Sequence, residues 1–152
     1  MKIRRVSFGG TAAIVTSMAL VAGLDATSAS RATVITALLI AAVADNLTDS
    51  LSIHVYQESE RLEPRDAFVG TLSNFAARLA GCLTFVLIVA LSPPRAAFPA
   101  TIAWGMGLLA VLTFLVARER RVGAGAEIAK HLGVACAVLV VSRAIAEAFT
   151  RG

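Results

Sequence analysis

The sequence is poor in the residues on which many enzymes and secreted proteins depend. Its 152 residues include two cysteines, Cys82 and Cys136. Both lie within apolar stretches, which argues against a disulfide framework. No Cys/His spacing suggests zinc, and no phosphate-binding loop or nucleophile motif occurs. With no nucleophile–base pair visible, we do not expect an enzyme.

Apolar residues are abundant instead, and they occur in blocks. They make up 57% of the chain, against about 45–50% in ordinary soluble domains, and the mean hydropathy is +0.78. A bilayer core of roughly 30 Å needs about 20 apolar helical residues, which is close to the length of each block. We therefore predict an all-α, polytopic membrane protein that is a single domain over residues 1–152. Its five predicted transmembrane helices are residues 6–24, 32–56, 68–91, 98–117 and 129–149.

Two of the block boundaries have particular sequence features. Pro93-Pro94 cannot continue a helix and predicts a sharp turn between the third and fourth spans. The first block could alternatively be a signal peptide, because small residues at Ala26–Ala29 follow it. The block is long for that purpose, and four more apolar blocks follow, so we favour a first span.

Basic residues cluster at the ends of the spans, where they predict orientation. The net charge is +4, but this placement fits membrane insertion better than nucleic-acid binding. A cytoplasmic N-terminus puts nine basic residues inside and three outside. The nine are Lys2, Arg4, Arg5, Arg61, Arg65, Arg118, Arg120, Arg121 and Lys130, and the three are Arg31, Arg95 and Arg151. We therefore expect the N-terminus in the cytoplasm and the C-terminus outside.

Ionisable residues inside the predicted spans are the candidate functional groups, because each is costly in a bilayer and usually has a partner or a function. They are Asp45, Asp49, Arg78, Arg143 and Glu147. Asp45 and Asp49 are four residues apart and share a helix face. Asn46, Ser50 and His54 form a neighbouring stripe.

Antiparallel pairing of the second and third spans predicts specific partners. Counting from the short loop between them places Asp45 level with Arg78, and Asp49 level with Asn74. We expect an ion pair between Asp45 and Arg78 and a hydrogen bond between Asp49 and Asn74. In the fifth span, the four-residue spacing of Arg143 and Glu147 predicts a local pair.

Two interpretations of these charges remain open. They could satisfy one another and set the register of the helices. Alternatively, Asp45 and Asp49 could bind a divalent cation in transit, since such ions prefer several oxygen ligands. The acidic loop that carries Glu58, Glu60 and Glu63 would then form the cytoplasmic mouth.

The layout resembles that of the vacuolar iron transporter family. The end of the first block, Ser17-Met-Ala-Leu-Val-Ala-Gly-Leu24, is similar to the family's Phe-Ala-Leu-x-Ala-Gly-Leu. The end of the second block occupies the place of the motif in the family's second span and ends in the same Ser-Glu. Its sequence is Thr48-Asp-Ser-Leu-Ser-Ile-His-Val-Tyr-Gln-Glu-Ser-Glu60. The resemblance implies a five-helix homodimer that exchanges ferrous iron or manganese, usually against protons.

The chain departs from the family's pattern at the metal ligands. Ala12 and Ala41 stand where the family has an Asp and a Glu, and Asp49 stands where it has a Met. The cytoplasmic metal-binding helices between the second and third spans are absent. We therefore expect a divergent member, in which Fe²⁺ or Mn²⁺ would be transported and no cofactor is tightly bound. A scaffold or sensor without transport is the alternative. The Ala- and Arg-rich composition suggests a bacterial inner membrane.

Overall fold

The computed structural model describes residues 3–59 and 64–150, except for the side chains of residues 3–9, 53, 57–59, 64–67 and 70. Within these ranges the chain is all-helical. The five helices are α1 (Ile3–Ala26), α2 (Arg31–Ser59), α3 (Pro64–Leu91), α4 (Pro94–Arg120) and α5 (Ala124–Thr150). They run longer than the predicted spans, because backbone hydrogen bonding continues past the apolar block into the charged flanks.

The described turns show why the helices end where they do. Ser28 adopts a left-handed backbone with φ 57°, and the Ala29 N–H bonds to the Leu24 carbonyl, so α1 ends in a Schellman motif. The Ser30 hydroxyl accepts the Thr33 N–H and caps α2. Pro94 begins α4, as the sequence predicts for a residue that cannot continue α3. Arg121, also left-handed, ends α4 in the same way as Ser28 ends α1.

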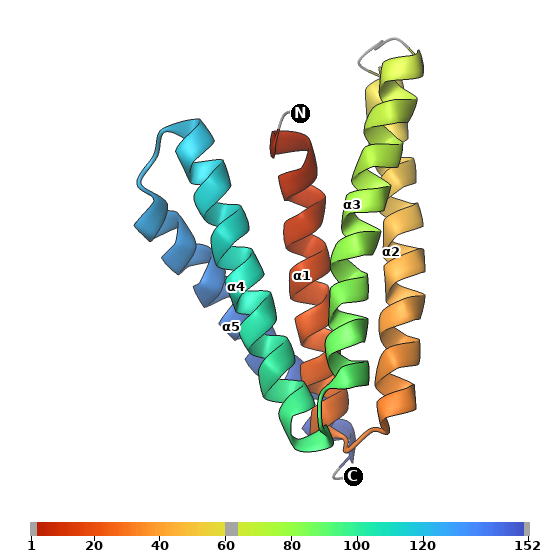
Figure 1. Cartoon of the computed structure of the whole chain (residues 1–152), viewed down its shortest axis with the longest axis vertical. Helices are drawn as coiled ribbons and strands as arrows, with labels where there is room; N and C mark the ends of the chain where they lie inside the picture. The colour runs from red at the N-terminus through yellow and green to blue at the C-terminus, as the bar shows by residue number, and fades with distance from the viewer. Residues whose placement is uncertain (1–2, 60–63, 151–152) are drawn as a thin grey trace.

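The helices alternate in direction, so the two termini lie at opposite ends of the bundle (Figure 1). We call these the N-terminal end, which also carries the α4–α5 turn, and the C-terminal end, which carries the α1–α2 and α3–α4 turns. Helix α1 is central and contacts each of the other four helices, while α2 and α3 share the most extensive contact.

The apolar core lies around α1. Its largest fully buried apolar side chains are Met18, Leu38, Phe85 and Leu109, from α1, α2, α3 and α4 respectively. Gly105 of α4 permits this packing, because a Cβ there would overlap the side chain of Met18 and lie 3.2 Å from Phe85 Cε1. The helices on either side of α1 therefore meet across a tightly packed centre.

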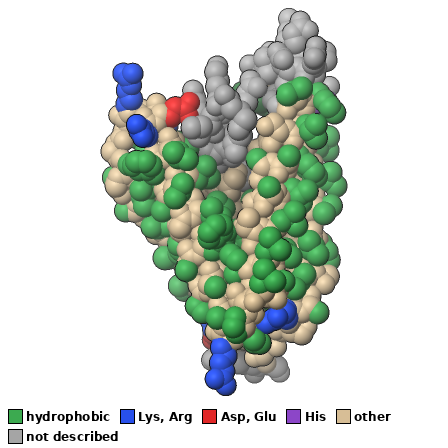
Figure 2. All heavy atoms as spheres, in the orientation of Figure 1, with side chains coloured by type: hydrophobic (Ala, Val, Ile, Leu, Met, Phe, Trp, Pro, Cys, Tyr) green, Lys and Arg blue, Asp and Glu red, His purple; other side chains and the backbone are tan. Residues whose placement is uncertain are grey.

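The outer surface is apolar along its length. Large aliphatic and aromatic side chains are exposed on α2, α3, α4 and α5, and they cover much of the face in Figure 2, with basic groups at its two ends. Among the residues whose side chains the structure describes, four helical segments are long and apolar enough to cross a membrane: Arg31–Tyr56, Thr71–Leu91, Pro94–Arg120 and Ala124–Thr150. Such an apolar surface is stable against lipid and unfavourable in water. These features define an integral membrane protein. In α1 the described side chains begin at Gly10, and the apolar segment Gly10–Ala26 is what they show of this helix.

Candidate intramembrane polar site

A polar cluster lies between α2 and α3 in the half of the bundle nearer the N-terminal end. On α2 the buried stripe is Val34, Leu38, Ala42, Asn46 and Ser50, spaced four residues apart. On α3 the buried polar residues are Asn74 and Arg78, followed by the buried Cys82. The stripe that begins as aliphatic core therefore continues as a polar one along the same helix face.

Arg78 is the centre of this cluster. It is 3% exposed, and its Nε donates a hydrogen bond of 2.9 Å to Asn46 Oδ1. Its Nη1 forms an ion pair with Asp49. The Asp49 side chain is 37% exposed, so the buried guanidinium pairs with a carboxylate that reaches the surface of the bundle.

Three buried side chains near this ion pair carry polar atoms that have no hydrogen-bond partner among the described residues. These atoms are Asn46 Nδ2, Ser50 Oγ and both amide atoms of Asn74. An unpaired buried polar group costs about 1–3 kcal/mol. Ser50 is one turn after Asn46, and Asn74 one turn before Arg78, so antiparallel packing brings them to a similar level. The cluster thus has hydrogen-bonding capacity that the described residues do not use.

The cluster lies well inside the apolar zone. Arg78 follows the start of the predicted span 68–91 by ten residues, and Asp49 precedes the end of the predicted span 32–56 by seven. At 1.5 Å per residue, these positions are about 15 Å and about 10 Å inside the span ends. The ion pair is therefore an intramembrane one, which usually marks a partner-dependent or functional site.

The partners differ from those predicted by counting along the hairpin. The expected pair of Asp45 with Arg78 is wrong, because Arg78 pairs with Asp49 and Asn46. The expected bond between Asp49 and Asn74 is also wrong, since the amide of Asn74 bonds to none of the described residues, Asp49 included. The predicted level of Arg78 along α2 was nearly right, because Asn46, which accepts the hydrogen bond from Arg78, is adjacent to Asp45 in the chain. The helix is rotated so that the Asn46 stripe faces inward.

Asp45 instead lies exposed on the outer surface of α2. It precedes Tyr56, the end of the candidate span, by eleven residues, or about 16 Å along the helix axis. Hydrocarbon cannot solvate a carboxylate at that depth. Nearby Thr48 and Ser52 bond to backbone carbonyls of their own helix. The outer face of α2 therefore needs water or another protein chain at Asp45.

Arg143 also has a partner other than the predicted one. Its Nη1 forms an ion pair of 3.1 Å with Asp25 of α1, and its guanidinium lies 5.1 Å from the ring centre of Phe98. This contact joins α5 to α1, whereas the local pair of Arg143 with Glu147 stays a prediction. Asp25 lies in a predicted break between spans, so its sequence position carried no signal of the contact.

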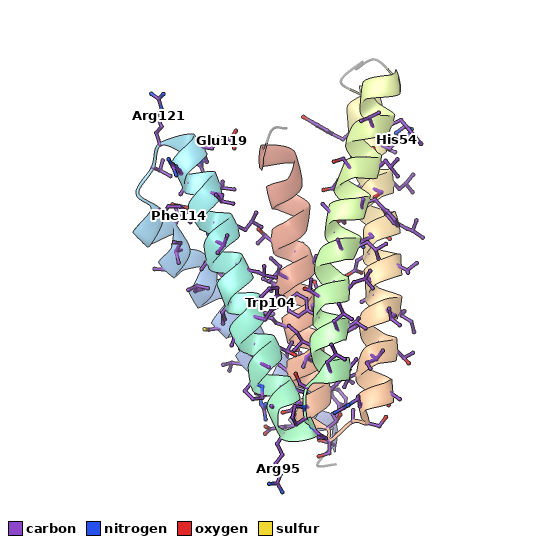
Figure 3. The ribbon with its side chains drawn as sticks, in the orientation of Figure 1. His54, Arg95, Trp104, Phe114, Glu119 and Arg121 are labelled. Carbon is purple, nitrogen blue, oxygen red and sulfur yellow. The ribbon has the colours of Figure 1, made fainter. Side chains whose placement is uncertain are left out.

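Polar contacts continue beyond the cluster toward the C-terminal end. The Ser17 hydroxyl of α1 approaches Cys82 Sγ at 3.9 Å, and Trp104 donates to the Thr84 hydroxyl at 2.9 Å. Figure 3 shows Trp104 near the middle of α4, whereas Arg95 and Arg121 point away from opposite ends of the bundle. A cavity of about 240 Å³ lies at the C-terminal end, with Asp25 and Arg31 among its lining residues.

The predicted metal ligands are only partly described. Glu60 and Glu63 lie outside the described residues, as does the side chain of Glu58. In the described part of the chain, no three His, Cys, Asp or Glu side chains gather as a metal site. Such a grouping leaves out amide and hydroxyl oxygens, which the buried Asn46, Ser50 and Asn74 carry in the cluster. The sequence spacing that singled out Asp45 and Asp49 applies equally to Asn46 and Ser50.

Fold and site together define the class: an integral membrane helical protein in which a buried arginine of one helix pairs with a carboxylate of the next. Comparison with models of known families, with curated proteins and with solved structures finds no match. The function must therefore be argued from the site itself.

Proposed function

We propose that this protein transports a divalent cation, such as ferrous iron or manganese, across a membrane. The observation that carries the proposal is the polar cluster about 10 Å or more inside the ends of the predicted spans. There the carboxylate of Asp49 pairs with Arg78, and Asn46, Ser50 and Asn74 carry buried polar atoms that have no hydrogen-bond partner among the described residues. Divalent cations of this kind accept carboxylate, amide and hydroxyl oxygens as ligands. The resemblance of the second span to the vacuolar iron transporter family points to the same cargo.

In this proposal α1 is a fifth span, the N-terminus is cytoplasmic, and the membrane is a bacterial inner membrane. The basic α4–α5 turn then lies in the cytoplasm, at the same end of the bundle as the N-terminus (Figure 1). Lys and Arg are retained on that side during insertion. The acidic loop with Glu58, Glu60 and Glu63 would gather cations at the cytoplasmic mouth.

A homodimer is part of the proposal. The central position of α1 leaves the outer face of α2 for a second copy. Asp45 is exposed on that face at a depth where lipid cannot solvate it. A second α2 would cover the carboxylate and enclose a wet path beside it.

Transport is tested with the purified protein in liposomes. Uptake of Mn²⁺ and Fe²⁺ is measured with and without a pH gradient, for the wild type and for Asp49→Asn. Glu119→Gln is the matched control, because it removes an exposed carboxylate at the N-terminal end of the bundle (Figure 3). We expect uptake by the wild type and the control, and at least a tenfold loss in Asp49→Asn.

Uptake that survives Asp49→Asn would reject the site but keep transport. Absence of uptake of either ion would favour a second function, a non-transporting scaffold or sensor. One observation supports this second function: Arg78 is already neutralised by Asp49 and bonded to Asn46, as a pair that only fixes helix register would be.

A further inference from the structure

The position of the Arg78 guanidinium suggests what the cluster binds. Two of the groups around it are oxygen acceptors: Asn46 Oδ1 at 2.9 Å and the carboxylate of Asp49. One turn away, Asn74 Oδ1 and Ser50 Oγ are buried and have no hydrogen-bond partner among the described residues. Together these are four oxygen-bearing side chains, and the Arg78 guanidinium contacts two of them.

We propose that the guanidinium of Arg78 occupies a divalent-cation site formed by Asp49, Asn46, Ser50 and Asn74, and that the cargo ion binds by displacing it. This inference rests on the proposed function and gives it a mechanism. A carboxylate, two amide oxygens and a hydroxyl form a hard ligand set suited to Mn²⁺ or Fe²⁺. The tethered guanidinium neutralises Asp49 whenever the site holds no ion, so the empty carrier does not expose a bare carboxylate to the membrane interior.

The displaced guanidinium requires another anion. Asp45 lies one turn before Asp49 on α2 and is exposed. Arg78 reaches α2 at the level of Asn46, next to Asp45 in the chain. Arg78 thus exchanges between two carboxylates, Asp49 in the empty site and Asp45 when the ion is bound.

The test measures Mn²⁺ binding to the full-length protein in lipid nanodiscs, from the loss of the free-ion electron paramagnetic resonance signal. Arg78→Gln removes the internal competitor, so Mn²⁺ should bind at least tenfold more tightly than to the wild type. Arg95→Gln is the matched control, because it removes an exposed arginine that points away from the C-terminal end (Figure 3). Its affinity should stay within twofold of the wild type.

A second variant leaves the ion pair in place. Asn74→Leu removes one oxygen and keeps Arg78 and Asp49, and it should weaken Mn²⁺ binding about tenfold. If Asn74 were only structural, the same change would remove two unpaired buried atoms, raise the thermal stability and leave Mn²⁺ affinity unchanged. Unchanged affinity in Asn74→Leu would overturn the inference even if Arg78→Gln failed to fold.

The role of Asp45 is tested through Arg78. Asp45→Asn should weaken Mn²⁺ binding in the wild type and have no effect in the Arg78→Gln background. Equal weakening in both backgrounds would make Asp45 a direct ligand and would overturn the exchange. Liposome uptake of Mn²⁺ by the wild type, with no change of affinity in Arg78→Gln or Asn74→Leu, would refute this inference alone. Absence of both Mn²⁺ binding and uptake in every variant would refute the proposed function as well.

Discussion

At the scale of single residues, the structure depends on a few close contacts in an otherwise uniform apolar interior. Membrane helices associate through close packing and a small number of hydrogen bonds, because lipid is as apolar as the core. The contact between Gly105 and Met18 and the bond from Trp104 to Thr84 are examples. Single substitutions at such contacts should therefore change the stability of the bundle, even where they leave the apolar composition nearly unchanged.

Gly105→Ala is expected to destabilise the bundle by about 1–3 kcal/mol, because the added methyl group would overlap Met18 at the centre of the core. Gly107→Ala is the matched control, since nothing lies within 4 Å of a Cβ there. Thermal unfolding in detergent, followed by loss of the monodisperse chromatographic peak, compares the two. Equal stability of both variants would show that Met18 moves aside without cost. Recovery of stability on adding Met18→Ala to Gly105→Ala would identify the clash as the cause.

At the scale of the elements, helix ends are set by local hydrogen bonds and helix faces by packing. Ser28 and Arg121 end α1 and α4 in left-handed conformations, and Ser30 begins α2. The start of α2 is also tied to the end of α3, where Arg31 donates to the carbonyls of Ala90 and Ser92. The pairing of α2 with α3 therefore has polar contacts at the C-terminal end and again at Arg78.

Ser30→Ala should lower the stability by about 1 kcal/mol, since the Thr33 N–H loses its capping oxygen. Ser30→Asp should retain the wild-type stability, because a carboxylate caps equally well. The measurement is the thermal midpoint of the purified protein in detergent. A loss in Ser30→Asp as large as that in Ser30→Ala would contradict capping as the role of this hydroxyl.

At the scale of the whole molecule, the alternating helices place the termini at opposite ends (Figure 1). With an apolar belt between charged ends, the bundle has two possible orientations in a membrane. The basic α4–α5 turn, with Arg118, Arg120 and Arg121, favours the one in which this turn is cytoplasmic.

Reporter fusions test this orientation. Alkaline phosphatase fused after residue 152 should be active, because the enzyme folds only outside the cytoplasm, whereas a fusion after Gly123 should be inactive. Green fluorescent protein at the same two positions should give the opposite pattern. Reversal of both patterns would mean that the bundle inserts with its N-terminus outside. The proposed cation mouth would then lie on the outer side of the membrane.

The sequence by itself determined the helical class and the position of the described turns. These features follow from the length of the apolar blocks, from Pro93-Pro94 and from the charges at the block ends. The reason is that the thickness of a bilayer requires about 20 apolar residues in each spanning helix. It also placed the polar groups of α2 and α3 at nearly the right depth, since an antiparallel hairpin leaves little freedom along its axis. The four-residue spacing correctly grouped Asn46 with Ser50 and Asn74 with Arg78.

Only the tertiary structure decided which face of each helix turns inward. In a soluble helix the polar side marks the surface, but here both the lipid face and the core face are apolar, so periodicity does not identify the inner one. Packing against α1 and α3 selects the face with Leu38, Ala42 and Asn46. With these faces turned inward, Arg78 pairs with Asp49, and Asp45 stays exposed. Arg143 of α5 pairs with Asp25 of α1 across the bundle.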